Sequence, residues 1–299
     1  MIDRREFLKL TGMGTLGLVI QDKIPSSDYH HVSHNPIEWK HAAEGLEFSR
    51  TNVYRNDKQM EVIAALKINP ELNKIRVFNG YSKTGIESRY IESWQEKTGA
   101  LAMINSNQYM SNPFLYPCAL VICDGEQKGP KYNKSSRGML VAEPKDLASK
   151  LKKADLLDFD YDEFDYKTTP YTQGVQHWPI LLDREGKIKT KESDWQANRT
   201  VVAKTKDNEI LFMTTEGGYF TLYNFGRFLK DSSSREDKGF NIHTAMNMDG
   251  GYEAEMIVKT PNINYMHYGE FETQGKDKDM SVLDIKTAIP GVIGIFPRN

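Results

Sequence analysis

The spacing of apolar residues predicts a hairpin followed by a helix in the second half of the chain. Two strand-like runs, 199–204 and 209–218, are separated by the polar tripeptide 206–208, which is typical of a hairpin turn. Between residues 221 and 229 the apolar positions recur three and four apart, as on one face of an amphipathic helix. The residues predicted to pack this helix on the sheet are Leu222, Phe225 and Leu229.

Strand-like runs continue from Leu46 to Phe296 without a flexible linker, so residues 37–299 are predicted to form a single domain. Around the helix the order is strand, helix, strand, loop, strand, and the last of these strands covers 255–259. We therefore expect an α+β fold with twisted mixed or antiparallel sheets and a few packed helices. Two segments have patterns of their own: 143–153 predicts a short amphipathic helix, and 259–278 predicts a surface excursion.

Composition agrees with one compact domain and argues against one class of partner. Of the 299 residues, 39% are hydrophobic, which is enough for a sizeable core at this length. Lys and Arg number 39 against 41 Asp and Glu, and the formal net charge is -2. No basic surplus is present to attract a polyanion, so nucleic acid is not an expected partner.

The first 36 residues resemble an export signal followed by a linker. The pair Arg4-Arg5 precedes Phe7 and a mildly apolar run that ends at Ile20, as in twin-arginine signals. This run is too short to span a bilayer as an ordinary helix. No small-x-small cleavage site follows it, so retention as an N-terminal anchor is one alternative. The other alternative is an ordinary amphipathic N-terminal helix. We expect an exported protein of the bacterial periplasm or outer surface.

Two features suggest a disulfide or a metal site, but the residues favour structural interpretations. Cys118 and Cys123 are five apart in a run that predicts a buried strand, so their side chains point to opposite faces and a mutual disulfide is not expected. The acidic run 155–165 lacks the glycine and the terminal glutamate of an EF-hand loop. We interpret it as a solvated connector with aromatic anchors and assign no metal to it.

The stretch from Thr244 to Gly251 carries the strongest chemical signal. It places an amide, Asn247, and a carboxylate, Asp249, directly before a glycine pair at the end of an apolar run. Gly250 and Gly251 let a ligand approach the main chain closely. Asp-Gly alone favours a hairpin turn. Its position between a predicted helix and a predicted strand favours a catalytic or binding loop.

The segment from Arg199 to Val258 resembles the core of the phosphodiester glycosidase family. Members of this family have an arginine at the start of a strand, a Thr-Leu pair on a helix and then the motif Ala-x-Asn-x-Asp-Gly-Gly. The corresponding residues here are Arg199, Thr221-Leu222 and Ala245 to Gly251. Weak motifs that occur in the right order are worth more together than any one of them alone.

The resemblance extends from Trp39 to Pro297. The run 102–109 stands where the family has a strand that ends in Ile-Asn-Gly-Gly and aromatic residues, and 176–183 is similar to its Pro-x-Leu-x-x-Asp-Gly strand and turn. Two departures crowd the expected pocket: Ser106-Asn107 replace the glycine pair, and Tyr252-Glu253 replace a third glycine and a serine. The alternative function is therefore a non-catalytic protein of this fold that binds an envelope glycan or a phosphate-bearing polymer.

The resemblance implies an exported hydrolase that cleaves a sugar-1-phosphodiester in cell-envelope or scavenged glycans. Cleavage at the anomeric carbon releases a phosphomonoester, a good leaving group, so the need for a strong general acid is relaxed. A carboxylate must still activate water or stabilise the developing cation, and a cation must hold the phosphate. Asp249 is the candidate for the first role and Arg199 for the second.

Further candidates surround these two residues. Glu216 precedes a Gly-Gly pair and is either a second catalytic carboxylate or part of a helix-capping turn. Candidates for binding the sugar or the phosphate, through amide, hydroxyl or main-chain groups, are Asn105, Asn107, Asn247, Thr215, Gly250 and Gly251. No cofactor is identified, and Ca²⁺ is an open alternative without a recognisable ligand spacing. A serine triad has no support because no Gly-x-Ser-x-Gly motif is present.

Overall fold

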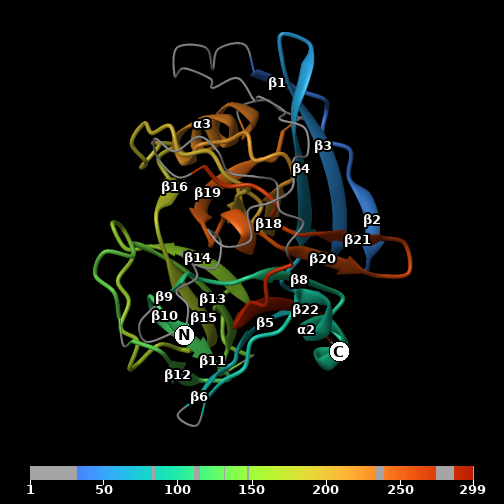
Figure 1. Cartoon of the computed structure of the whole chain (residues 1–299). Coiled ribbons are helices and arrows are strands. Elements are labelled where there is room, and N and C mark those ends of the chain that lie inside the picture. Colours follow the sequence, from blue (N-terminus) through green and yellow to red (C-terminus); the bar gives the residue numbers. More distant parts are fainter. Residues whose placement is uncertain are drawn as a thin grey trace, which may run out of the picture.

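The computed structural model describes residues 32–82, 85–110, 115–130, 132–146, 148–233, 239–273 and 286–298. The expected export signal and linker, residues 1–36, lie outside these ranges except for the last five, of which Val32–His34 form strand β1. The described residues form one mostly β domain with two α-helices (Figure 1). The fold is thus richer in β-structure than the expected α+β class. Every strand pair in the described ranges is antiparallel, so the sheets are not mixed.

The largest sheet has eight strands in the order β1-β3-β4-β18-β17-β19-β16, with β2 paired to β3. The helix α3, Leu222–Ser233, lies beside β16 and β19 at one end of the molecule (Figure 1). The remaining strands of this sheet are β2 Lys40–Ala43, β3 Leu46–Arg55, β4 Lys58–Ile68, β16 Ile180–Leu182, β17 Thr200–Thr205, β18 Ile210–Thr215 and β19 Ile242–Asn247.

Two five-stranded sheets complete the domain. The second sheet has the order β12-β11-β15-β13-β14, and its strands are β11 Val121–Cys123, β12 Glu126–Lys128, β13 Gly138–Pro144, β14 Ala154–Asp158 and β15 Tyr171–His177. The third has the order β21-β20-β8-β22-β5, and its strands are β5 Asn73–Asn79, β8 Ala102–Asn105, β20 Met256–Lys259, β21 Asn264–His267 and β22 Gly291–Pro297. The short elements are β6 Tyr81–Ser82, β7 Gly85–Ile86, α2 Ile91–Thr98, β9 Tyr109–Met110, β10 Tyr116–Pro117 and the 3-10 turn η2 Gly251–Glu253.

The middle of the large sheet, at β17 and β18, is buried on both faces, which explains the continuous apolar runs there. Successive side chains on a strand point to opposite faces. On β18, Phe212 belongs to the central core that the three sheets share, whereas Leu211 and Met213 belong to the core beneath α3. Strands covered on both sides lose the alternation of apolar and polar residues that marks a half-exposed sheet.

The predicted hairpin and helix are confirmed. Strands β17 and β18 pair in register from Thr200–Thr214 to Lys204–Ile210. Helix α3 buries Phe225 and Leu229 completely, and Leu222 packs against the same core. The side-chain oxygen of Thr221 accepts a hydrogen bond from Asn224 N at 3.1 Å, which caps the first turn.

One local prediction is wrong, and another is incomplete. Residues 143–153 do not form a helix: β13 runs to Pro144, and the described residues that follow make turns. The excursion 259–278 contains a strand, because Asn264–His267 pairs with β20. Polar side chains are compatible with this strand because β21 is at the edge of its sheet.

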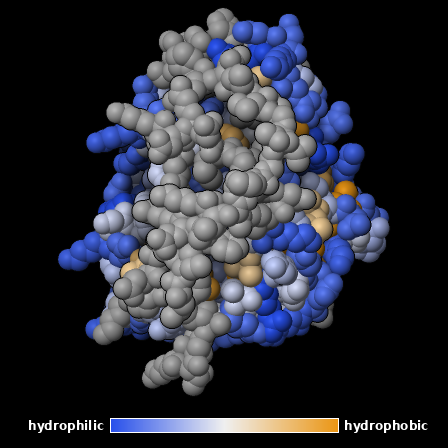
Figure 2. All heavy atoms as spheres, viewed as in Figure 1, coloured by the Kyte–Doolittle hydropathy of each residue, from blue (hydrophilic) through white to orange (hydrophobic). Residues whose placement is uncertain are grey.

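The described surface is mostly hydrophilic in the view of Figure 2, and its hydrophobic residues form small separate patches. Exposed large hydrophobic residues such as Leu72 and Trp195 come from different parts of the chain. None of the helices within the described ranges is long and apolar enough to cross a membrane.

Candidate functional site

The loop with Asp249 connects two sheets. It leaves β19 of the large sheet at Asn247 and enters β20 of the third sheet at Met256. The main chain of Asp249 is held on both sides: its carbonyl accepts a hydrogen bond from Asn105 Nδ2 at 2.8 Å, and its N–H donates to Ser106 O at 3.4 Å. The predicted site residues Asn105 and Asp249 are therefore neighbours, although 144 positions separate them.

Asn105 braces the loop through its side chain. Besides the bond to Asp249, its Oδ1 accepts hydrogen bonds from Thr200 Oγ1 at 2.8 Å and from Glu255 N at 3.1 Å. Asn105 is only 2% exposed. Its amide thus joins β8, β17 and the start of β20, rather than presenting free donors to a ligand as the sequence analysis proposed.

The carboxylate of Asp249 faces the segment that follows β8. It is half-buried, and its Oδ1 accepts a hydrogen bond from Gly250 N at 3.1 Å. Burial raises the pKa of the Cys118 thiol to about 11, and the negative charge of Asp249 acts in the same direction. Burial is also the main cause that raises the pKa of Tyr109, and charges at Cys123 and Asp249 add to it. The charge of Asp249 therefore acts on both Tyr109 and Cys118, and the sequence analysis did not connect Cys118 with this loop.

Arg199 enters this site from the start of β17. Its guanidinium is fixed by two carbonyls: Nε donates to Phe220 O at 3.1 Å and Nη2 to Trp195 O at 2.5 Å. The residue is 7% exposed, and burial lowers its pKa to about 10, so the group remains charged at neutral pH. The remaining nitrogen, Nη1, lies near Gly250, where a Cβ would be 3.8 Å from it. Arg199 and Asp249 thus converge on the glycine pair.

The two glycines are tightly surrounded. A Cβ on Gly250 would lie 2.9 Å from Asn198 O, and one on Gly251 would lie 2.6 Å from Glu272 Oε2. Gly251 also has φ +68, a conformation that favours glycine. The N–H of Gly250 donates to the Asp249 carboxylate and that of Gly251 to Asn198 O at 2.8 Å. Both N–H groups therefore stabilise the loop itself in this structure.

Glu216 is placed in a different cluster. Its carboxylate accepts two hydrogen bonds from Arg50, at 2.8 and 2.5 Å, and one from Tyr265 OH at 2.8 Å. Thr215, its neighbour, accepts a hydrogen bond from Arg199 N at 2.9 Å through Oγ1 and so supports the main chain of the arginine. Of the two alternatives for Glu216, a second catalytic carboxylate or part of a helix-capping turn, neither is tested by these contacts, which pair it with Arg50 and Tyr265.

The other two amides have unused hydrogen-bonding atoms within the described ranges. Asn247 donates to Trp178 O at 3.4 Å, and its buried Oδ1 has no hydrogen-bond partner there. Asn107 accepts from Ser106 Oγ at 3.3 Å, and its buried Nδ2 likewise has none. Next to Trp178, the His177 ring is fully buried, which lowers its pKa to about 4 and keeps it neutral.

Ser106, the first family departure, has its hydroxyl beside Tyr109 and β22. Its hydroxyl is 2.9 Å from Tyr109 OH, and a Cβ on Gly291 of β22 would lie 2.6 Å from Ser106 Oγ. Ser106 thus fills space against the third sheet. Tyr252, at the second departure, is 8% exposed.

Glu272 and Asn198 are site residues that the sequence analysis missed. Asn198 Oδ1 accepts hydrogen bonds from Glu270 N at 2.9 Å and Phe271 N at 2.8 Å, which sets the 270–273 segment beside the glycine pair. Asn198 is adjacent to Arg199, a signal that could have been used. Glu272 had none, because its position depends on a pairing between segments more than seventy residues apart.

Glu61 stabilises the turn whose carbonyl holds Arg199. This buried carboxyl accepts main-chain hydrogen bonds from Gly217, from Tyr219 at 2.8 Å and from Val62 at 2.9 Å. It therefore fixes the turn that carries Phe220, the carbonyl partner of Arg199. Burial raises the pKa of Glu61 from 4.5 to about 7 in spite of these three donors.

The raised pKa of Glu61 predicts that its contribution to stability depends on pH. The folded protein holds this proton where the unfolded chain has lost it, so the contribution is fully present below pH 4.5 and is lost as the pH rises through about 7. We expect a loss of about 2–3 kcal/mol between pH 4.5 and 8. Urea unfolding of the wild type and of Glu61→Gln at both pH values measures it.

The comparison of the two proteins isolates Glu61. Burial also raises the pKa of Glu255, which adds a fall of the same sign to both proteins. The Glu61→Gln variant should therefore lose less stability than the wild type over this pH range. An equal loss in both would show that Glu61 does not titrate there.

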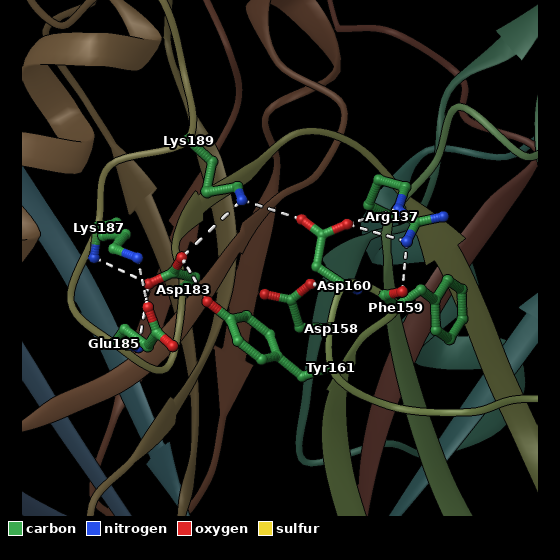
Figure 3. A network of polar contacts seen from close by, with 9 residues as sticks. All are labelled: Arg137, Asp158, Phe159, Asp160, Tyr161, Asp183, Glu185, Lys187 and Lys189. Carbon is green, nitrogen blue, oxygen red and sulfur yellow. Dashed lines mark hydrogen bonds and ion pairs between the residues drawn. The ribbon is translucent and has the colours of Figure 1, made fainter.

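The acidic run lies in a separate polar network (Figure 3). Asp160 accepts a hydrogen bond from Arg137 Nε at 3.0 Å and is paired with Lys189 at 2.9 Å. Tyr161 OH donates a hydrogen bond to the buried Asp183 at 3.2 Å. Residues 159–165 agree with the interpretation as a connector, but residues 155–158 belong to strand β14. In the described part of the chain, no group of three or more His, Cys, Asp or Glu residues is placed to hold a metal ion.

The Phosphodiester glycosidase (NAGPA) family matches residues 98–296. No curated protein matches the chain. Among the solved structures, the zebrafish N-acetylglucosamine-1-phosphodiester alpha-N-acetylglucosaminidase catalytic domain, auto-inhibited by its pro-peptide, has a TM-score of 0.60 at 16% identity, over 90% of this chain and 89% of that one.

Two further structures are more distant. A hypothetical protein from Synechocystis has a TM-score of 0.54 at 12% identity, over 88% of this chain and 64% of that one. A putative exported protein from Burkholderia pseudomallei K96243 has a TM-score of 0.47 at 10% identity, over 79% of this chain and 74% of that one. At these identities the structural matches describe the fold alone.

Proposed function

Because this chain belongs to the Phosphodiester glycosidase family, we propose that it hydrolyses the bond between a sugar's anomeric carbon and a phosphodiester. The single observation that carries the proposal is the convergence of Asp249 and Arg199 on Gly250. The carboxylate hydrogen-bonds to the Gly250 N–H, and a Cβ on Gly250 would lie 3.8 Å from Arg199 Nη1. A carboxylate and a fixed cation thus both lie near Gly250, which has no side chain of its own.

Arg199 binds the phosphate in the proposed reaction. Its Nε and Nη2 are held by carbonyls, so the guanidinium does not have to be ordered when the substrate binds. Its pKa of about 10 keeps it positively charged at neutral pH. A charged donor in a buried setting stabilises the negative charge that the phosphate gains as the bond breaks.

Asp249 acts on the sugar side. Water attacks the anomeric carbon while the Asp249 carboxylate accepts a proton from it, the bond from this carbon to oxygen breaks, and its electron pair leaves with the phosphomonoester. The hydrogen bonds of Asp249 N and O to Ser106 and Asn105 hold the carboxylate in place. The side-chain oxygen of Asn247, Oδ1, is assigned to a sugar hydroxyl because it has no other partner in the described ranges.

Glu216 is not part of the proposed chemistry. Three hydrogen bonds from Arg50 and Tyr265 already engage its two oxygens. We assign it a structural role between β3, β18 and β21. We also propose that the reaction takes place outside the cytoplasm, on the basis of the export-like residues 1–36.

The test of this function is turnover. The purified protein is incubated with a panel of sugar-1-phosphodiesters, and released phosphomonoester is measured with a phosphatase-coupled phosphate assay. The panel includes N-acetylglucosamine 1-phosphodiesters, which the name of the zebrafish relative suggests. Hydrolysis of at least one member supports the proposal. No hydrolysis of any member, with or without added Ca²⁺, would favour the alternative of a glycan- or phosphate-polymer-binding protein.

A further inference from the structure

A second carboxylate, Glu272, lies on the other side of the glycine pair. A Cβ on Gly251 would be 2.6 Å from Glu272 Oε2 and 2.9 Å from Glu272 Cδ, so the carboxylate packs directly against the Gly251 main chain. The positive φ of +68 at Gly251 and this contact both require a glycine there. The charge of Glu272 also acts on Arg199, where it raises the pKa against the effect of burial. Glu272 is thus close to the proposed phosphate site.

The segment that carries Glu272 is held in place by hydrogen bonds. Asn198 N donates to Phe271 O at 2.9 Å, and the Asn198 side chain accepts two N–H groups in return. Thr273 N donates to Gln196 O at 2.8 Å. Glu272 lies between these anchored positions and forms a bridge with Ala197. The main chain at Glu272 is therefore held beside Arg199.

The charges of these three side chains do not cancel. Around the glycine pair lie one buried cation, Arg199, and two carboxylates, Asp249 and Glu272, and the charges of these three side chains sum to -1. A phosphodiester brings one negative charge to this site. A phosphomonoester brings up to two, because its second ionisation has a pKa of about 6. The additional charge meets a carboxylate at short range in a partly buried site, where repulsion is weakly screened.

We propose that Glu272 makes the Arg199 site select singly charged phosphodiesters over doubly charged phosphomonoesters. The inference rests on the proposed function, in which Arg199 holds the phosphate. It has two consequences for that reaction. Sugar 1-phosphates are excluded as substrates, and the phosphomonoester product is expelled once its second proton has left.

Equilibrium binding of two small probes tests the selectivity without requiring turnover. Dimethyl phosphate represents the diester and methyl phosphate the monoester, and isothermal titration calorimetry at pH 8 gives their affinities for wild type and Glu272→Gln. We expect the substitution to strengthen methyl phosphate binding about tenfold and to change dimethyl phosphate binding much less. At pH 5, where methyl phosphate carries one charge, the difference between the two proteins should largely disappear.

The matched control is Glu270→Gln. It removes the same charge from the same segment, at an exposed position two residues away, and should alter neither affinity. Thermal unfolding of both variants verifies that they are folded. The proposal is overturned if Glu272→Gln does not bind methyl phosphate more tightly than the wild type at pH 8, undetectable binding included, or if Glu270→Gln has the same effect.

The outcome is independent of the turnover assay. A shift in probe selectivity together with no hydrolysis in the substrate panel would retain the selectivity site and refute the glycosidase reaction. Hydrolysis in the panel without the shift would retain the reaction and refute the role of Glu272.

Discussion

Replacing Asp249 by Asn is expected to lower kcat on a hydrolysed sugar-1-phosphodiester by about 10²–10⁴-fold, the usual contribution of a general base. The amide is nearly isosteric, and its oxygen can still accept the hydrogen bond from Gly250 N that the carboxylate accepts at 3.1 Å. The fold should therefore persist, and the midpoint of urea unfolding should stay close to that of the wild type. Steady-state kinetics and urea unfolding of the same preparations measure the two effects.

Glu216→Gln is the matched control, because Glu216 is the other carboxylate for which the sequence suggested catalysis. Its loss weakens a partly exposed pair with Arg50 that contributes about 0–1 kcal/mol to stability. We expect kcat to stay within a few-fold of the wild type. Equal losses in the two variants would place Glu216 in the chemistry, and full activity of Asp249→Asn would remove Asp249 from it.

Replacing Asn105 by Ala is expected to cost about 2–4 kcal/mol of unfolding free energy, one of the larger effects available at a single polar residue. The substitution leaves three buried groups without their partner: the Asp249 carbonyl, the Thr200 hydroxyl and the Glu255 N–H. Because the Asp249 loop loses its anchor, turnover should fall as well. Urea unfolding and kcat/KM of the folded fraction give the two values.

Asn107→Ala provides the comparison for Asn105. Asn107 is equally buried, at 1% exposure, but its only side-chain contact in the described ranges is the 3.3 Å bond from Ser106 Oγ. The free energy of unfolding should drop by less than half as much as in Asn105→Ala. If Asn107 binds substrate, its variant raises KM. Similar stability losses in both variants would show that the hydrogen bonds of Asn105 do not stabilise the Asp249 loop.

The sequence predicted the elements that carry this site, because their signals are local. Family membership, inferred from motifs between Arg199 and Val258, is confirmed by the match to residues 98–296. The three- and four-residue spacing of α3 is visible in the chain itself, as is the polar turn between β17 and β18. Strand β21 was missed because an edge strand with polar residues has no apolar alternation to reveal it.

The direction of polar side chains could not be predicted in the same way. A buried amide after a strand looks alike whether it binds a ligand or main chain, and Asn105 binds main chain. Glu216 follows β18 next to a Gly-Gly pair, but only the neighbouring strands place Arg50 and Tyr265 at its carboxylate. Glu272 is brought to Gly251 by the contacts of Asn198 with a distant segment. These contacts depend on the tertiary structure and leave no signal in the local sequence.

The position of β22 sets the time at which this site can exist during protein synthesis. Gly291–Pro297 lies between β8 and β5, and Ser106 N, next to the Asn105 brace, donates to Gly291 O at 3.2 Å. A growing chain that has not yet released these residues from the ribosome has β5 and β8 without the strand that joins them. Pairing across almost two hundred residues is also slow, because a large loop must close first. A chain that ends before β22 should therefore lack the ordered site, and the proposed activity should require β22.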